Sequence, residues 1–245
     1  MYSTDGSVHH SGINTEKETI KFLNDIKFYS EPLVHLGGTK NKADAIAGEK
    51  QWSIKKKNGI KNGSFDFFNT SSYNSFLGNH FDGFLEEMKE HRDMSITLRE
   101  VSVSLNRTDF SRLCLSAFSK IDTDNLTQIL TDTFQNDCYD FIINDVVAKN
   151  LYIFPLSDHP VSVLLKAGAT PILSPGRGRS SQKILFQLGD EIIDDGLRLR
   201  ITSNNGIRAF LGLSKANRNS QVVMKLQQDN IPNIIRKSNP QIIDY

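Results

Sequence analysis

The chain has 245 residues and a nearly balanced charge, with 29 basic residues, 28 acidic residues and a formal net charge of +1. This balance excludes a histone-like protein that binds DNA by bulk charge. The length suits one domain, with or without a small appended lobe. No apolar run approaches the roughly 20 residues that cross a bilayer, and the first residues lack the apolar core of a secretory signal. We therefore expect a soluble protein with no membrane partner.

The cysteines indicate a reducing compartment. Cys114 and Cys138 are the chain's two cysteines, too few and too scattered for a disulfide framework or a zinc ribbon. We expect two buried free thiols in a cytoplasmic protein.

Charge is distributed unevenly along the chain. Basic residues are dense in 50–61, 177–183 and 198–218, whereas acidic residues gather in 86–93, 122–145 and 190–195. Such segregation is typical of a protein with one basic cleft, and it modestly favours nucleic-acid binding.

The first part of the chain predicts a helix followed by a small sheet. Thr15 and Glu18 have the spacing of a capping box, which marks the start of a helix. The alternating pattern after residue 42 is typical of short strands. The expected elements are a helix from Thr15 to about Ile26 or Lys27, an apolar stretch Leu33–Leu36, strands Ala43–Ala47 and Gln51–Lys55 joined by a turn at Gly48–Glu49, and a strand or edge segment Ser64–Phe68.

The rest of the chain predicts a helical segment and then a β-rich one. Helices are expected around Phe76–Met88, Leu105–Phe118, Leu126–Phe134 and Phe141–Val147, and strands at Leu151–Phe154, Val161–Leu165, Pro171–Leu173, Lys183–Leu188, Leu197–Ile201 and Gln221–Leu226. This order predicts an α+β fold in one domain, 1–245, with a core at about 14–72, a helical segment at about 73–150 and a β-rich segment at about 151–245.

Asp44 and Lys55 form the candidate catalytic pair. In the strand Gln51–Lys55, Trp52 and Ile54 point to one face, which leaves Ser53 and Lys55 together on the other. If the two strands pair across the turn, Asp44 lies beside Lys55. A carboxylate can bind Mg²⁺, which polarises a phosphate and lowers the pKa of a bound water. A lysine can stabilise the charge that develops on the phosphate, or orient the attacking water.

This arrangement resembles the PD-(D/E)xK nuclease superfamily, in which an Asp and an acidic-x-Lys pair occupy adjacent strands. Lys42–Ile46 is similar to its metal-binding aspartate strand, and Ser53–Lys55 to its catalytic lysine strand. With the preceding helix and the stretches Leu173–Gly178 and Leu197–Ile201, the chain resembles small type II restriction endonucleases of the MspI type. The resemblance implies a restriction-endonuclease-like core, a central mixed sheet flanked by helices, with a β-rich C-terminal part that recognises DNA.

The sequence departs from this family at Ser53, which occupies a position that usually holds Asp or Glu, or Gln or Asn in this subgroup. A second carboxylate must then complete the metal site. Related nucleases often supply a glutamate from the first helix, so Glu18 is the best candidate. Glu49 is the other nearby carboxylate, but as a turn residue it is expected to point away from the site.

Several residues are candidates to contact DNA. Arginines in a flexible loop can read guanine, while serines and lysines hold phosphates. The candidates are Lys42, Lys56, Lys57, Ser64, Ser174, Arg177, Arg179, Ser180, Ser181, Asn204 and Arg218.

These patterns predict a Mg²⁺-dependent, site-specific endonuclease of double-stranded DNA, acting as a monomer or homodimer. A DNA methyltransferase with the same recognition site is a possible functional partner. Two alternatives stay open: another nuclease with the same core, such as a phage-encoded, homing or repair enzyme, or a DNA-binding relative that has lost catalysis at Ser53.

Overall fold

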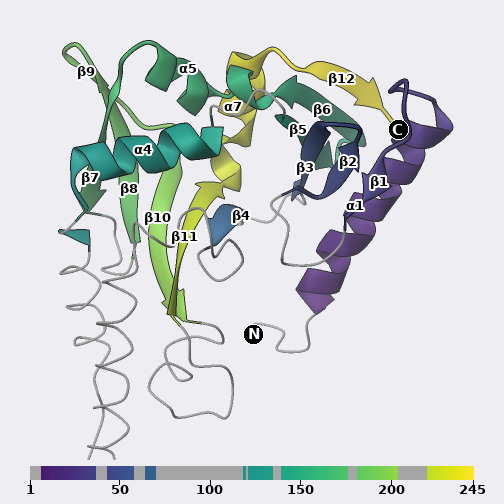
Figure 1. Cartoon of the computed structure of the whole chain (residues 1–245), viewed down its shortest axis with the longest axis horizontal. Helices are drawn as coiled ribbons and strands as arrows, with labels where there is room; N and C mark the ends of the chain where they lie inside the picture. Colours follow the sequence, from purple (N-terminus) through teal and green to yellow (C-terminus); the bar gives the residue numbers. More distant parts are fainter. Residues whose placement is uncertain are drawn as a thin grey trace, which may run out of the picture.

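The computed structural model describes residues 7–36, 43–57, 64–69, 118–119, 121–134, 139–175, 181–203 and 220–245. The described chain is a mixed α+β structure with two sheets and four helices of the α type (Figure 1). The α+β prediction is therefore confirmed. Within the described residues, no helix combines the length and the apolar character needed to cross a membrane.

The first sheet, sheet A, is a mixed six-stranded sheet that carries the candidate catalytic pair. Its first three strands are antiparallel neighbours, β3 and β5 run parallel, and the last two strands are again antiparallel. In spatial order its strands are β1 (Val34–His35), β2 (Ala45–Ala47), β3 (Lys50–Lys57), β5 (Tyr139–Asp145), β6 (Asn150–Pro155) and β12 (Gln241–Asp244).

A tight turn joins β2 to β3, as the sequence predicts. Gly48 has φ +57°, in the left-handed region that glycine enters without steric cost. The register pairs Ala45 with Trp52, and the backbone N–H of Asp44 donates to the carbonyl of Trp52 at 2.8 Å. Asp44 therefore continues the pairing one residue before β2 begins.

Helix α1 (Ser7–Asp25) covers one face of sheet A (Figure 1). Its Ile20 and Leu23 are buried with Trp52 and Ile54 of β3 in one hydrophobic cluster. The helix begins eight residues before Thr15, so the predicted capping box is wrong: Thr15 lies inside the helix, and its carbonyl accepts a hydrogen bond from Thr19 Oγ1 at 2.7 Å.

The second sheet, sheet B, is antiparallel and buries one face. Successive side chains of a strand point to opposite faces, and in β8 the alternate residues Gln182, Ile184 and Phe186 are buried. Its strands are β4 (Ser64–Asn69), β11 (Ser220–Gln227), β10 (Leu197–Ser203), β8 (Ser181–Leu188) and β7 (Thr170–Pro175), with β9 (Glu191–Ile193) paired to β8.

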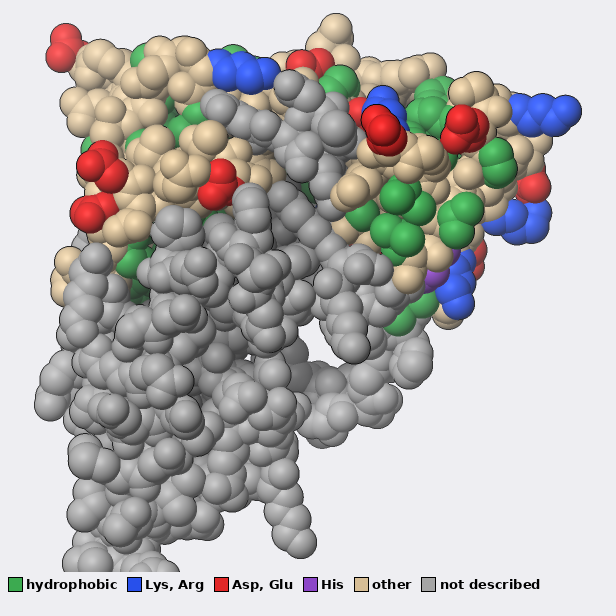
Figure 2. Space-filling model, in the orientation of Figure 1, with side chains coloured by type: hydrophobic (Ala, Val, Ile, Leu, Met, Phe, Trp, Pro, Cys, Tyr) green, Lys and Arg blue, Asp and Glu red, His purple; other side chains and the backbone are tan. Residues whose placement is uncertain are grey.

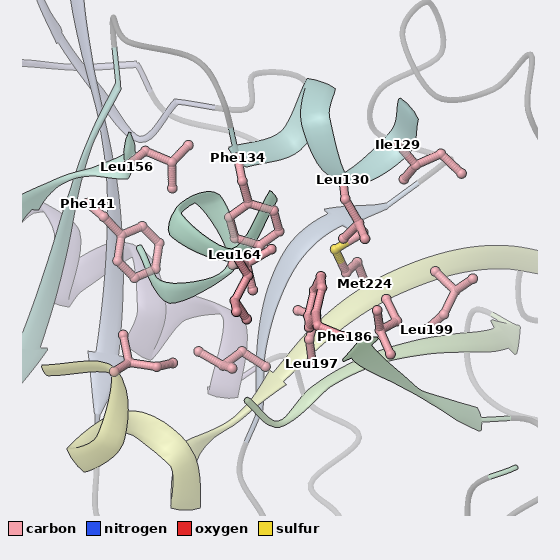
Figure 3. Close-up of a cluster of buried hydrophobic side chains, with 14 of the residues drawn as sticks. Ile129, Leu130, Phe134, Phe141, Leu156, Leu164, Phe186, Leu197, Leu199 and Met224 are labelled. Atoms are coloured by element: carbon pink, nitrogen blue, oxygen red, sulfur yellow. The ribbon is translucent and has the colours of Figure 1, made fainter. Parts of the chain in front are cut away.

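One hydrophobic cluster joins the two sheets. It combines Phe141 of sheet A with Phe186, Leu199 and Met224 of sheet B (Figure 3). His159 packs among its aromatic rings, where complete burial lowers the pKa of the imidazole to about 3. The helices that contribute to this cluster are α4 (Thr123–Phe134), α5 (Pro160–Lys166) and α7 (Ile231–Ser238); short 3₁₀ turns occupy Leu156–Asp158 and Gln228–Asn230.

Two predicted elements are wrong, and both lie in this region. Phe141–Val147 was expected to be helical, but Tyr139–Asp145 is the central strand β5. Val161–Leu165 was expected to be a strand, but Pro160–Lys166 is helix α5, in which Pro160 stands in the first turn and His159 Nδ1 accepts from Val161 N–H. The helix predicted at Phe76–Met88 lies outside the described residues, as does the helix predicted at Leu105–Phe118 apart from Phe118 itself.

Sheet A combines strands from all three of the segments that the sequence suggests. β5 comes from the segment expected to be helical, and β6 and β12 come from the β-rich C-terminal segment. Figure 2 shows acidic side chains over β9 and α4, and a mixture of charged and hydrophobic side chains over sheet A and α1.

Candidate active site

Asp44 and Lys55 meet at the hairpin of sheet A. Lys55 Nζ lies 3.4 Å from Asp44 Oδ2, and Ser53 Oγ lies 3.3 Å from the same oxygen. The backbone N–H of Ile54 donates to this oxygen at 2.7 Å. The predicted juxtaposition of Asp44, Ser53 and Lys55 is thus present in the structure.

Strand alternation explains why these side chains converge. Trp52 and Ile54 face helix α1, so Ser53 and Lys55 lie on the opposite face of β3. Asp44 reaches across from the start of β2, and its N–H···O bond to Trp52 sets its position along β3. The site is built on paired strands, which place side chains more precisely than a loop does.

The carboxylate is partly shielded from water but remains accessible. The side chains of Asp44 and Lys55 are 18% and 19% exposed. In such surroundings a charge pair interacts more strongly than in bulk water. In the described part of the chain, the three donors that reach this carboxylate all contact Oδ2, so Oδ1 is the oxygen left to take a cation.

The donor set fits Mg²⁺ in a limited way. Mg²⁺ typically keeps several waters and uses one or two carboxylates together with substrate phosphates. Asp44 supplies one such carboxylate, and Ser53 supplies a neutral oxygen that is a weak ligand. The described residues contain no group of three or more His, Cys, Asp or Glu side chains that could hold a metal ion.

Glu18 is not brought to Asp44. It lies on α1, which packs on the face of sheet A opposite Ser53 and Lys55, and its side chain is exposed. Its charge acts instead on Tyr245, whose pKa is raised mainly by burial and further by Glu18. The prediction that Glu18 completes the metal site therefore has no support in this geometry, because the sheet separates the two residues.

Glu49 lies at the exposed tip of the turn between β2 and β3, as the sequence predicts. It therefore does not replace the missing second carboxylate either.

Two further carboxylates flank β3, and neither was singled out from the sequence pattern. Asp140 binds Lys50 Nζ at 2.7 Å, and Asp145 forms an ion pair with Lys57. Burial alone would raise the pKa of Asp145, but the bond from Lys57 and the backbone N–H donors of the following turn lower it. Both acids belong to β5, which the sequence predicted as a helix, so their positions beside β3 could not be seen.

A histidine–carboxylate pair lies near the site on the other side of the sheet. His35 Nε2 is 3.0 Å from Glu16 Oε2, and the two side chains are 17% and 22% exposed. His35 pairs with Ala45 in the register, and Ala45 belongs to the hydrophobic cluster beneath α1. The pair therefore links α1 to β1 rather than facing Lys55.

The predicted DNA contacts are placed only in part. Lys57 is engaged with Asp145, and Lys56 also has an interaction partner. Ser174 and Ser181 are half-buried on β7 and β8 of sheet B. Ser64 begins β4. Lys42, Arg177, Arg179, Ser180, Asn204, Arg218 and the predicted thiols Cys114 and Cys138 lie outside the described residues.

Comparison of the chain with protein-family models, with curated proteins and with solved structures finds no match.

Proposed function

We propose that the protein is a Mg²⁺-dependent endonuclease that hydrolyses phosphodiester bonds of double-stranded DNA. The observation that carries the proposal is the Asp44–Lys55 pair, with Nζ and Oδ2 separated by 3.4 Å across two adjacent strands. A buried or half-buried carboxylate–lysine pair has structural uses as well. Here, however, it lies beside a serine hydroxyl and remains accessible to solvent.

The architecture supports the same proposal. The resemblance drawn from the sequence requires a mixed central sheet flanked by helices, with the aspartate and the lysine on neighbouring strands. Sheet A is mixed, α1 covers one face, and the cluster containing α4 and α5 lies against the other. Asp44 lies one residue before β2, and its Oδ2 is 3.4 Å from Lys55 Nζ on β3, which supports the proposal.

The residues divide the chemistry between them. Asp44 would hold Mg²⁺ through Oδ1, and the bound ion would polarise the scissile phosphate and acidify a water. Lys55 carries a positive charge to the face where the phosphate would lie and stabilises the negative charge that develops during attack. The Ile54 N–H and Ser53 Oγ hold Oδ2 in place, so the carboxylate is oriented before DNA binds.

Plasmid cleavage tests this proposal directly. With Mg²⁺, the wild-type protein should cut plasmid DNA into discrete fragments, and sequencing the fragment ends would give the recognition site. Asp44→Asn keeps an oxygen to accept the Ile54 N–H, and Lys55→Ala removes the cation. Each variant should lose cleavage by about 10²- to 10³-fold while DNA affinity changes little.

Lys21→Ala is a suitable control, because Lys21 lies on the exposed side of α1 in an ion pair with Asp25. It should cut at the wild-type rate. Wild-type cleavage by Asp44→Asn or Lys55→Ala would show that the site is elsewhere. A single nick, or one rare cut, would favour a repair or homing type of nuclease over a restriction enzyme.

A DNA-binding protein without catalysis is a second candidate, and Ser53 favours it. This residue occupies the position of the second acidic ligand, and the described residues contain no group of three or more His, Cys, Asp or Glu side chains that could hold a metal ion. Stable DNA binding that needs no Mg²⁺, with no cleavage and no change in Asp44→Ala, would establish this alternative.

A further inference from the structure

Three basic residues stand side by side on neighbouring strands of sheet B. The register places Arg198 of β10 opposite Lys225 of β11, and the same Arg198 opposite Lys183 of β8. We call Lys183, Arg198 and Lys225 the basic row. Ser174 of β7 continues the row beyond Lys183, and Asp66 of β4 stands opposite Lys225 at its other end.

The basic row lies on the face of sheet B that points away from the hydrophobic core. Residues that alternate with it, Ile184, Leu199 and Met224, are fully buried in the shared cluster. Because neighbouring residues of a strand point to opposite faces, Lys183, Arg198 and Lys225 occupy the outer face. The side chain of Lys183 is 38% exposed, and Arg198 and Lys225 are half-buried.

This arrangement is costly unless something offsets the positive charge. Like charges directly opposite each other destabilise an antiparallel pair of strands. Asp194 offsets part of the charge: it binds Lys183 Nζ at 2.6 Å, and its pKa, which burial would raise, is lowered by Lys183 and by the nearby Arg198. Arg198 Nε is buried and has no acceptor in the described part of the chain.

We propose that the basic row binds successive phosphates of a DNA backbone, which extends the proposed endonuclease function by naming a surface that holds its substrate. Neighbouring strands are about 4.8 Å apart, so the row spans roughly 10 Å. The row is therefore long enough to reach two neighbouring phosphates of one DNA strand. Ser174, next to Lys183, adds a hydroxyl that can donate to phosphate.

The salt dependence of DNA binding measures these contacts. Affinity for a duplex would be measured between 50 and 200 mM salt for the wild-type protein and for Lys183→Gln, Arg198→Gln and Lys225→Gln. Each substitution should make the slope of log K against log salt shallower by about 1, equally on all sequences. Lys166→Gln, at the exposed end of α5, should leave the slope unchanged. Arg198→Lys keeps the positive charge, so its salt slope should be close to that of the wild-type protein.

Asp194→Asn should strengthen duplex binding, whereas the three neutralising substitutions should weaken it. It removes the acid that neutralises Lys183 while Asn can still accept the Gly196 N–H, so the row becomes more positive. Duplex binding should tighten by about threefold at low salt. A purely structural role for these charges predicts no tightening.

The outcomes separate this inference from the proposed function. Wild-type salt slopes in all three neutralised variants, while cleavage still depends on Asp44, would overturn the basic row alone. If the neutralised variants have shallower salt slopes but the Asp44 and Lys55 variants still cleave at the wild-type rate, the basic row is supported and the proposed catalytic site is wrong. If the neutralised variants lose affinity for RNA but not for duplex DNA, the proposed role of the basic row in DNA binding is also wrong. A wild-type protein that binds no DNA would contradict both the basic row and the proposed endonuclease function.

Discussion

Strand β3 of sheet A and the basic row of sheet B place lysines on strands in opposite ways. On β3, three lysines each contact a carboxylate of a neighbouring strand or segment: Lys50 with Asp140, Lys55 with Asp44 and Lys57 with Asp145. In sheet B, the three cations lie opposite one another on neighbouring strands. Asp194 forms an ion pair with Lys183 and also interacts electrostatically with Arg198. The ion pairs of β3 each join one lysine to one carboxylate, whereas in sheet B one carboxylate lies between two cations, so Lys183, Arg198 and Asp194 together keep a net positive charge. Lys225 has an interaction partner of its own.

One hydrophobic cluster joins the two sheets, so we expect them to unfold as one cooperative unit, and substitutions in this cluster should have the largest effect on stability. Phe141 is 1% exposed on β5, and Met224 is fully buried on β11. Phe141→Ala should lower the free energy of unfolding by about 3–5 kcal/mol and Met224→Ala by about 2–5 kcal/mol, because each leaves a cavity. Urea denaturation would measure both, with Trp52 fluorescence and circular dichroism as probes.

Trp52 is the chain's one tryptophan, and it lies in sheet A. Met224→Ala in sheet B should therefore shift the fluorescence transition that reports on sheet A. If Trp52 fluorescence keeps its wild-type midpoint while circular dichroism shows an earlier transition, the two sheets unfold as independent units.

The hairpin at the candidate site could be predicted from the sequence because its signals are local. Gly48 marks the turn, Trp52 and Ile54 alternate with Ser53 and Lys55, and an aspartate precedes a short apolar strand. These features fix which face each residue takes once the strands pair. The Asp44–Lys55 contact at 3.4 Å follows from them. The position of Glu18 did not follow, because the face covered by α1 depends on packing between distant segments.

The errors in β5 and α5 have physical causes. Both faces of β5 are buried: Phe141 and Ile143 pack into the cluster shared with sheet B, and Ile142 packs into the cluster beneath α1. A continuous apolar run of this kind cannot be told from a buried helix by its period. In α5, the β-branched Val161 and Val163 favour a strand, but Pro160 suits the first turn of a helix and overrides them.

Asp145→Asn tests whether the carboxylates of sheet A stabilise the fold. The side chains of Asp145 and Lys57 are 3% and 25% exposed, so the variant leaves a largely buried lysine without its counter-charge. We expect a loss of about 3 kcal/mol in the free energy of unfolding. The measurement is urea denaturation at pH 7, with Lys21→Ala as a surface control.

The same variant has a predicted pH signature. Because the folded-state pKa of Asp145 is lowered, its stabilisation is fully present above the unfolded-state pKa of about 3.9 and is lost as pH falls through the folded-state pKa. The difference in stability between wild type and Asp145→Asn should therefore shrink below about pH 4. An equal difference at pH 3 and pH 7 would mean that the ionised carboxylate is not what stabilises β3 and β5.

Asp194→Asn is the matched change in sheet B and should have the smallest effect on stability. Asp194 resembles Asp145 in its lowered pKa, its single lysine ion pair and its bond from a backbone N–H. It differs in exposure, since the side chains of Asp194 and Lys183 are 35% and 38% exposed, where solvent screens most of the attraction. We expect a loss of at most about 0.5 kcal/mol in the same urea assay.

A loss as large as that of Asp145→Asn would show that Asp194 holds β8 to the loop before β10, and the cations of sheet B would then be structural like those of β3. A small loss together with tighter DNA binding would mean that the carboxylate tunes the charge of the row rather than holding the sheet together.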